Sequence, residues 1–275
     1  MFPIRGREVG TKDYNQKVKQ GDVNKKLYHK ALALCVNDLR SYNRLCGVSE
    51  KDAFDVITLE GKDAESAKIM VQECGVKLEH MDLVSKNVEF KVTKKNIKTG
   101  DLFTGELFNY LSMRRADTYD VANFDFCGTW ATQKYCVRRL FEEHMFDECS
   151  FLVVTCSGRG NPGSKSSYQR EDEEECIHDV MIWAWSHGYA AHVTHRPFHY
   201  GTMYVLFFKV IHLKNTMSYN GGIDCAITAQ EWLRTPIDIE VPTPLFNKNQ
   251  NQKKEKLKIV PTVGKKQKKR VLSRN

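Results

Sequence analysis

The stretch "YAAHVTHRPFHYGTMYVLFFKVIHL", residues 189–213, decides the fold class. It contains two strand-like segments, 189–198 and 202–213, and little more than "HYG" separates them. Two parallel strands need a crossover connection of about a dozen or more residues, so these two pair as an antiparallel hairpin or lie apart. We therefore expect the second strand to run against the rest of the sheet.

Strand-like and helix-like segments alternate along the chain before this hairpin. The predicted strands are 54–61, 78–85, 119–128 and 150–158, with a further candidate at 88–93. The predicted helices are 24–45, 63–75, 100–113, 131–146 and 170–188, and 226–234 is a candidate for one more. Such alternation indicates right-handed crossover units around a mainly parallel sheet, so the fold class is α/β.

Charge divides the 275-residue chain into three parts. Residues 247–275 contain eleven Lys and Arg but one acid, and residues 1–30 carry a net charge of +5. Because the total is +8, residues 31–246 are acidic, with a net charge of −7. We expect a flexible basic arm at 1–23, a folded domain at 24–235 and a basic, disordered tail at 236–275. Basic ends of this kind can bind a polyanion such as nucleic acid, or simply keep the chain soluble.

Composition excludes several classes of protein. No apolar run approaches the roughly 18–20 residues that span a bilayer, and the first residues do not form a secretory signal. The nine cysteines include no CxxC pair, which argues against a zinc ribbon or a disulfide framework. The sequence therefore predicts reduced thiols, no metal site, no membrane partner and a cytoplasmic or nuclear protein. It says nothing about the oligomeric state.

A parallel sheet that follows an N-terminal helix and ends in an antiparallel hairpin resembles the class I S-adenosylmethionine-dependent methyltransferases. The resemblance covers about residues 24–213 and implies a Rossmann-like three-layer sandwich with a C-terminal antiparallel strand. It also implies S-adenosylmethionine as the cofactor. The turn "TLEGKDAES" (58–66) keeps the acid and first glycine of the family's cofactor loop but lacks its further glycines, so the loop is degenerate.

The resemblance implies which residues bind the cofactor. Glu60 and Gly61 correspond to the start of the family's loop, and Gly100-Asp101 precedes a predicted helix where the family often places a carboxylate against adenine. The expected cofactor-binding residues are Glu60, Gly61, Asp63, Asp82, Asp101 and Leu102. The alternative is that Asp63 and Asp101 are helix N-caps.

The strand "YDVANFDFCG" (119–128) resembles the family's fourth strand, whose end carries the catalytic motif of many nucleic-acid methyltransferases. The expected catalytic residues are Asp125, Phe126, Cys127 and Gly128. The resemblance implies that Asp125 orients the acceptor and that Phe126 stacks on it. The family's prolines are absent here, and Cys127 alone reads as a buried free thiol rather than a nucleophile.

Basic and histidine residues near the same strand ends are expected to bind substrate: Arg159, Lys165, Arg196 and His199. Arg159 and Lys165 belong to the glycine-rich stretch 153–168, whose loop could contact phosphates or be an ordinary long loop. His192 and His195 lie three positions apart on a predicted strand, so they face opposite sides and do not form a metal site. Ribose methylation is disfavoured because Thr155 stands where those enzymes need a lysine.

These features predict a methyltransferase-like protein that acts on RNA or DNA. The alternative is a catalytically inactive subunit of the same fold that binds nucleic acid or assembles with a viral or ribonucleoprotein complex. A nucleotide-binding oxidoreductase is disfavoured because no GxGxxG follows any predicted strand. Binding of S-adenosylmethionine separates the first two hypotheses.

Overall fold

The computed structural model describes ten segments of the chain: residues 11–45, 54–61, 64–85, 102–114, 118–126, 128–158, 167–195, 197–200, 203–213 and 223–237. The candidate strand at 88–93, the start of the N-terminal arm and nearly all of the predicted tail lie outside the described residues.

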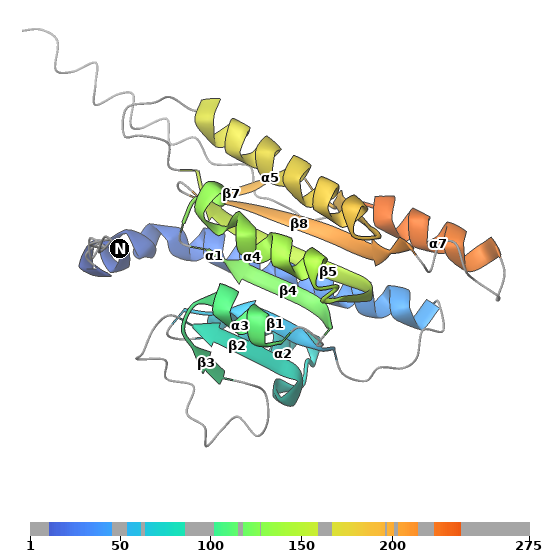
Figure 1. Cartoon of the computed structure of the whole chain (residues 1–275). Helices are drawn as coiled ribbons and strands as arrows, with labels where there is room; N and C mark the ends of the chain where they lie inside the picture. Colours follow the sequence, from blue (N-terminus) through green and yellow to red (C-terminus); the bar gives the residue numbers. More distant parts are fainter. Residues whose placement is uncertain are drawn as a thin grey trace, which may run out of the picture. The chain divides into compact units, whose positions relative to one another are not determined.

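Helices and strands alternate through these segments, as the sequence predicts (Figure 1). The helices are α1 (Thr11–Leu45), α2 (Glu65–Cys74), the 3-10 helix η1 (Leu78–His80), α3 (Leu107–Met113), α4 (Trp130–Glu142), α5 (Ser167–Ser186) and α7 (Ile223–Arg234). The strands are β1 (Val56–Leu59), β2 (Met81–Ser85), β3 (Leu102–Thr104), β4 (Tyr119–Asp125), β5 (Phe146–Ser157), β6 (Tyr189–Val193), β7 (Phe198–Tyr200) and β8 (Met203–His212).

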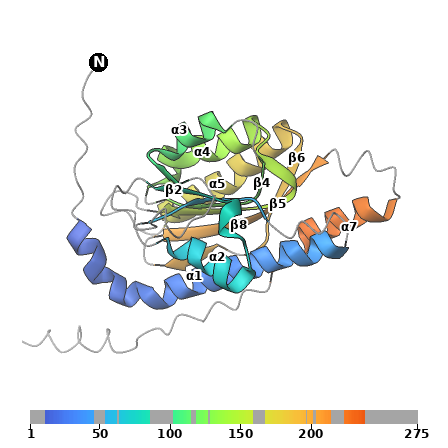
Figure 2. The same ribbon diagram turned by 90° about the horizontal axis from the view of Figure 1, so that it is seen from below.

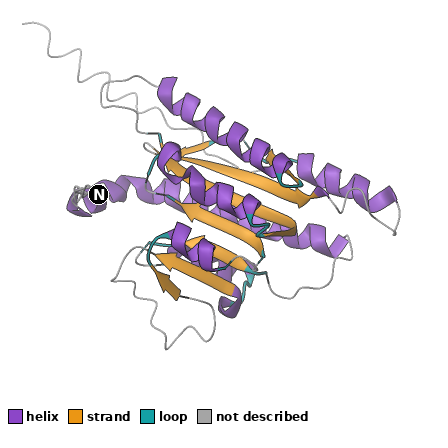
Figure 3. Ribbon diagram, in the orientation of Figure 1, coloured by secondary structure: helices purple, strands orange, loops and turns teal. Residues whose placement is uncertain are grey.

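One sheet joins all of these strands in the order β3-β2-β1-β4-β5-β8-β6, and β7 also pairs with β8 (Figure 3). Strands β1 to β5 are parallel, whereas β8 is antiparallel to β5, β6 and β7. The order 3-2-1-4-5 is that of the doubly wound Rossmann sheet, in which the strand order reverses between β1 and β4. The predicted fold class, a mainly parallel Rossmann-like sheet with a C-terminal antiparallel strand, is confirmed.

Helices cover both faces of the sheet and give the predicted three layers (Figure 2). Helices α1, α2 and α7 pack on one face, and their buried residues share a core with Val121 of β4 and Phe207 of β8. Helices α3, α4 and α5 pack on the other face, around Phe124 of β4 and Phe208 of β8. Neighbouring residues of a strand point to opposite faces of the sheet. Because helices cover both faces, the sequences of the buried strands are continuous apolar runs.

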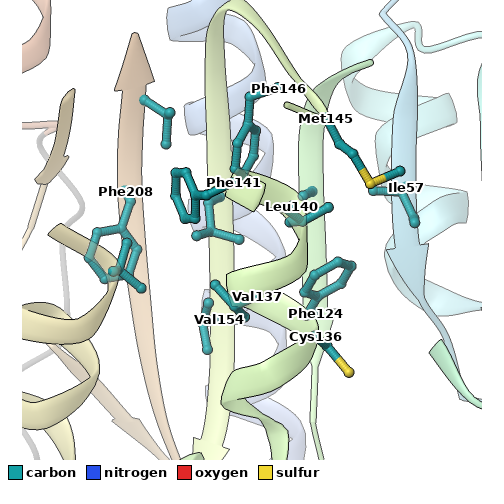
Figure 4. Close-up of a cluster of buried hydrophobic side chains, with 14 of the residues drawn as sticks. Ile57, Phe124, Cys136, Val137, Leu140, Phe141, Met145, Phe146, Val154 and Phe208 are labelled. Atoms are coloured by element: carbon teal, nitrogen blue, oxygen red, sulfur yellow. The ribbon is translucent and has the colours of Figure 1, made fainter. Parts of the chain in front are cut away.

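Helix α4 illustrates how the second core is built (Figure 4). Its buried residues Val137, Leu140 and Phe141 recur at helical spacing and lie over the strands between Ile57 and Phe208. Gly75 ends α2 with φ +63°, a left-handed conformation in which a glycine has no Cβ to clash.

The predicted strand 189–198 is divided into β6 and β7, and two further segments differ from the prediction. Residues 102–104 form strand β3 and only 107–113 are helical, because the short "LFT" pairs with Leu83–Ser85 of β2. Helix α1 begins at Thr11, so the predicted arm is helical from that residue onward. Its first two turns are polar and lack apolar periodicity, but a helix that is already nucleated extends at little cost through such residues.

Candidate functional site

The carboxyl ends of β1 and β4 bring Glu60 and Asp125 side by side. Leu59 pairs with Phe124 in the parallel ladder, and each acid is the neighbour of one of these two residues. The two acids therefore meet at one edge of the sheet. Gly61 directly follows Glu60, at the switch point where Rossmann-like sheets bind their ligands. Asp101 lies outside the described residues.

Polar residues occupy the last positions of three adjacent strands on the α1 face. Val56 of β1, Val121 of β4 and Val153 of β5 belong to the core beneath α1, and side chains two or four positions further along face the same way. Those positions hold Thr58, Glu60, Asn123, Asp125, Thr155 and Ser157. The sheet thus changes from apolar to polar as it approaches its carboxyl edge.

A ring of buried hydrogen bonds joins three of these residues to the helices. The Tyr28 hydroxyl of α1 donates to Asn123 Oδ1 at 2.6 Å, and Asn123 Nδ2 donates to Thr58 Oγ1 at 3.0 Å. Thr58 in turn donates to Glu60 Oε1 at 2.8 Å. The Ser66 side chain of α2 also hydrogen-bonds to Tyr28. We call Tyr28, Thr58, Glu60, Ser66 and Asn123 the Glu60 network.

The Glu60 carboxylate closes the first turn of α2. It accepts the Ala67 N–H at 2.9 Å and a bond from the backbone of Ser66. Ala64, the N-cap residue, makes no side-chain cap and adopts a left-handed φ of 47°, which costs about 1 kcal/mol in a residue with a Cβ. The carboxylate therefore takes the position where a phosphate would otherwise bind a helix N-terminus.

Burial raises the pKa of Glu60 to about 7, despite the hydrogen bonds that favour its ionised form. The nearby charge of Asp125 raises it further. Desolvation and the charges of Asp125 and Glu60 likewise raise the pKa of Tyr28, which therefore stays protonated as a donor. Near neutral pH, Glu60 can thus exist with or without its proton, and a positive charge beside it would favour the ionised form.

Two hydroxyl groups at the end of β5 are buried without a hydrogen-bond partner among the described residues: Thr155 Oγ1 and Ser157 Oγ. Thr155 pairs with Asp125 across the ladder, and Ser157 lies two positions further along the same face of β5. An unsatisfied buried hydroxyl costs about 1–3 kcal/mol, and such atoms in a native protein call for an explanation. A bound ligand that hydrogen-bonds to them would supply one.

Asp82 does not lie at this edge. It pairs with Ile57, three residues before Glu60, and its carboxylate accepts the Tyr119 hydroxyl at 2.7 Å. Leu102 begins β3 instead of following a strand, so its backbone is also away from the carboxyl end. The acid that follows β3 is Glu106, the N-cap of α3, which the sequence analysis did not select.

Phe126 is not placed to stack on an acceptor. Its side chain is 2% exposed and packs against Phe124, with the ring centroids 5.5 Å apart, in the core beneath α4. Alternation along the chain explains the difference, because the residue after Asp125 turns to the opposite face. Gly128 accepts the Ser157 N–H at 2.9 Å and so ties this turn to β5. A Cβ there would meet Gln133 at 2.7 Å.

His199 lies at the same edge of the sheet but on its α5 face. It pairs with Tyr204 of β8, and its Nε2 hydrogen-bonds to Glu173 of α5. The predicted site residues that lie outside the described residues are Asp63, Asp101, Cys127, Arg159, Lys165 and Arg196. The described residues contain no group of three or more His, Cys, Asp or Glu that could bind a metal ion. None of the described helices could cross a membrane, since each is too short or too polar.

The sequence analysis missed Tyr28 and Asn123, which connect α1 to the site. Tyr28 lies within the helix predicted at 24–45, but nothing in the sequence singled it out as part of the site. Asn123 is fully buried between the apolar residues Ala122 and Phe124. A buried amide is costly unless it is hydrogen-bonded. The asparagine in "VANFD" could therefore have indicated a buried polar network at this strand.

Comparisons with known proteins give similarity at the level of structure alone. No family model matches the chain, and no curated protein matches it. Solved structures that resemble it include spermidine synthase from Thermotoga maritima, with a TM-score of 0.41 and 10% identity over 72% of each chain.

Two methyltransferases are among the other similar structures. The plantazolicin methyltransferase BamL, solved with a desmethyl analogue and SAH, has a TM-score of 0.46 and 11% identity over 74% of this chain and 91% of its own. Trm1 from Pyrococcus horikoshii, solved with S-adenosyl-L-methionine, has a TM-score of 0.44 and 12% identity over 74% and 57%. These values are low, so the fold assignment rests on the strand order and directions.

Proposed function

We propose that this chain is an S-adenosylmethionine-dependent methyltransferase that acts on nucleic acid. The pair of carboxylates at the β1–β4 switch point, Glu60 and Asp125, is the observation that supports this most directly. Their repulsion contributes to the raised pKa of Glu60, and a cationic ligand would relieve it. S-adenosylmethionine carries two positive groups, a sulfonium and an ammonium.

The first turn of α2 favours this cofactor over a dinucleotide. A dinucleotide places its pyrophosphate on the free N–H groups at the start of the helix after β1. Here the Glu60 carboxylate already accepts from that turn, and its negative charge would repel a phosphate. A positively charged cofactor without a phosphate does not need those N–H groups and is not repelled by the carboxylate.

The residues at the edge divide into two sets in this proposal. Glu60 and the backbone at Gly61 hold the cofactor, which supplies a methyl group activated by its sulfonium. Asp125 accepts a hydrogen bond from the acceptor group and orients it, while the hydroxyls of Thr155 and Ser157 hydrogen-bond to the acceptor or cofactor. Methyl transfer to an acceptor held in place needs mainly positioning, which is what rigid strand ends provide.

Titration calorimetry with S-adenosylmethionine tests the proposal. We expect binding to release protons near pH 6.5, because a cation beside Glu60 lowers a pKa that starts at about 7. Affinity should therefore rise about tenfold between roughly pH 6 and pH 8. The heat measured in buffers of different ionisation enthalpy gives the number of protons released.

Glu60→Gln is the matched control, since it keeps an acceptor oxygen for Thr58 and Ala67 but cannot ionise. We expect this variant to bind about tenfold more weakly and to release no proton from position 60. If the wild-type chain shows no binding at any pH, the proposed cofactor is wrong. The catalytically inactive nucleic-acid-binding subunit would then be the better description.

The charge distribution supports nucleic acid as the substrate class. Eleven of the residues in 247–275 are Lys or Arg, with Glu255 as the sole acid, whereas residues 31–246 carry a net charge of −7. A basic segment attached to an acidic domain can bind phosphates without reading sequence. The base to be methylated would have to be unpaired or flipped out to reach a strand end.

Deletion of residues 247–275 should weaken binding to unrelated single-stranded RNA and DNA by a similar factor for each. It should also flatten the salt dependence, because each lost phosphate contact removes released counterions. Fluorescence anisotropy over a range of salt concentrations measures both effects. An unchanged salt slope would mean that these residues serve another partner.

A further inference from the structure

Six large apolar side chains are exposed among the described residues, and all of them lie on the α3–α4–α5 layer. They are Phe108 and Met113 of α3, Tyr135 of α4, and Met181, Ile182 and Trp185 of α5. We call these six residues the outer face. The described parts of α1, α2 and α7, on the other side of the sheet, expose no large apolar side chain. The apolar surface of this domain is therefore concentrated on one layer.

Helix α5 carries the most apolar part of the outer face. Met181, Ile182 and Trp185 are 44%, 46% and 70% exposed, and their spacing places them on one stripe of the helix. The opposite stripe is fully buried against the sheet and includes Val180 and Ala184. A surface helix normally exposes a polar stripe to water, but the last turns of α5 expose mainly these apolar side chains.

The charges around the outer face are already paired. Lys134 of α4 contacts Glu175 at 2.9 Å and Asp179 at 3.4 Å, both on α5. Arg138 pairs with Glu142, and Arg139 pairs with Glu143. This surface therefore offers few unpaired cations to a polyanion.

Residue types also indicate a protein partner. The guanidinium of Arg139 lies 5.8 Å from the centroid of the Phe108 ring. Trp, Tyr, Phe, Met and Arg are the residues that protein–protein interfaces favour. At 43–70% exposure, the six side chains together expose on the order of 600 Å² of surface to solvent. A standard interface uses about 800 Å² per partner, so the outer face with its polar rim has the required size.

We propose that the outer face is a homodimer interface, with the α5 stripe of one copy packed antiparallel on the α5 stripe of a second. The order of charges along α5 supports a second copy over an unrelated partner. Residues 171–175 are all acidic, and no acid follows Asp179 in the helix. An antiparallel pair whose two-fold axis passes through the α5 stripe lets Met181, Ile182 and Trp185 of the two copies meet. The acidic segments then lie at opposite ends of the interface, so like charges stay apart.

Sedimentation of the full chain between about 1 and 100 µM tests the association. We expect a dimer of 31.7 kDa subunits that dissociates on dilution. Trp185→Glu should raise the dissociation constant by about 30-fold or more, as expected for an aromatic at the centre of an interface. Its unfolding midpoint should stay near that of the wild type, because the side chain is 70% exposed. Ile182→Lys, measured in parallel, tests the same interface if Trp185→Glu folds poorly.

Asn37→Glu, on the exposed side of α1, is the matched control and should leave the mass unchanged. A photo-crosslinking residue at position 182 should give a covalent dimer, and the same residue at position 37 should not. The proposal is overturned if the chain is monomeric at about 100 µM, or if Trp185→Glu dimerises like the wild type. None of these measurements depends on cofactor binding.

Discussion

Replacing Lys209 by methionine is expected to lower the free energy of unfolding by about 3–5 kcal/mol. Lys209 lies in the middle of β8 and its side chain is fully buried. Methionine fills a similar volume but cannot donate a hydrogen bond, so the change removes the charge and leaves the packing largely in place. Chemical denaturation monitored by circular dichroism gives the difference in stability.

The expected cost follows from what Lys209 holds together. Its Nζ donates to the carbonyl oxygens of Trp232 and Thr235, each at 2.9 Å, and lies 3.0 Å from Asp38 Oδ2. It also sits 4.7 Å from the centroid of the Trp232 ring. Without it, two carbonyl groups lose a buried donor, and the partly buried Asp38 carboxylate keeps the Trp232 indole N–H but loses its cation. Removing one partner of such an ion pair is costly.

Lys30→Met, at an exposed position of α1, is the control and should change stability by less than about 0.5 kcal/mol. The loss in Lys209→Met should appear first as fraying of α7, whose last turn is attached to β8 through this lysine. Hydrogen exchange of the α7 amides measures that directly. A variant within about 1 kcal/mol of the wild type would show that water or relaxation replaces the lost contacts.

Local patterns in the sequence were enough to predict most of the fold. The short link before β8 required an antiparallel strand, and the apolar run of β5 indicated burial on both faces; both features are present. The start of α1 and the strand β3 could not be read in this way. One continues a helix through polar residues, and the other is a three-residue strand that depends on pairing with β2.

The candidate site was predictable where it depends on strand order and not where it depends on which way a side chain faces. Glu60 directly follows β1 and Asp125 ends the adjacent strand β4, so their proximity was predictable. Phe126 was assigned to the same site, although alternation turns it into the opposite core. The bond between Tyr28 and Asn123 joins residues 95 positions apart, and no local pattern predicts which helix residue meets which strand residue.

Asp125→Ala is expected to lower the rate of methyl transfer by at least about 100-fold while leaving cofactor affinity within about threefold. Asp125 is proposed to touch the acceptor, and an interaction that orients the acceptor in the transition state affects turnover more than cofactor binding. Removing the carboxylate also removes one cause of the raised pKa of Glu60. Single-turnover assays with radiolabelled cofactor and unstructured RNA measure the rate, and calorimetry measures the affinity.

Asp82→Ala provides a control from the other end of the same sheet. Asp82 is also a strand carboxylate, but it pairs with Ile57 and bonds to Tyr119, away from the carboxyl edge. This variant should lose some stability, because the Tyr119 hydroxyl loses its acceptor. If catalysis depends on the strand ends at the switch point, its rate of methyl transfer per folded molecule should not change. Equal losses of rate in both variants would mean that Asp125 acts through the fold alone. A loss confined to Asp125→Ala locates the acceptor at the end of β4, since the two acids differ chiefly in which end of the sheet they occupy.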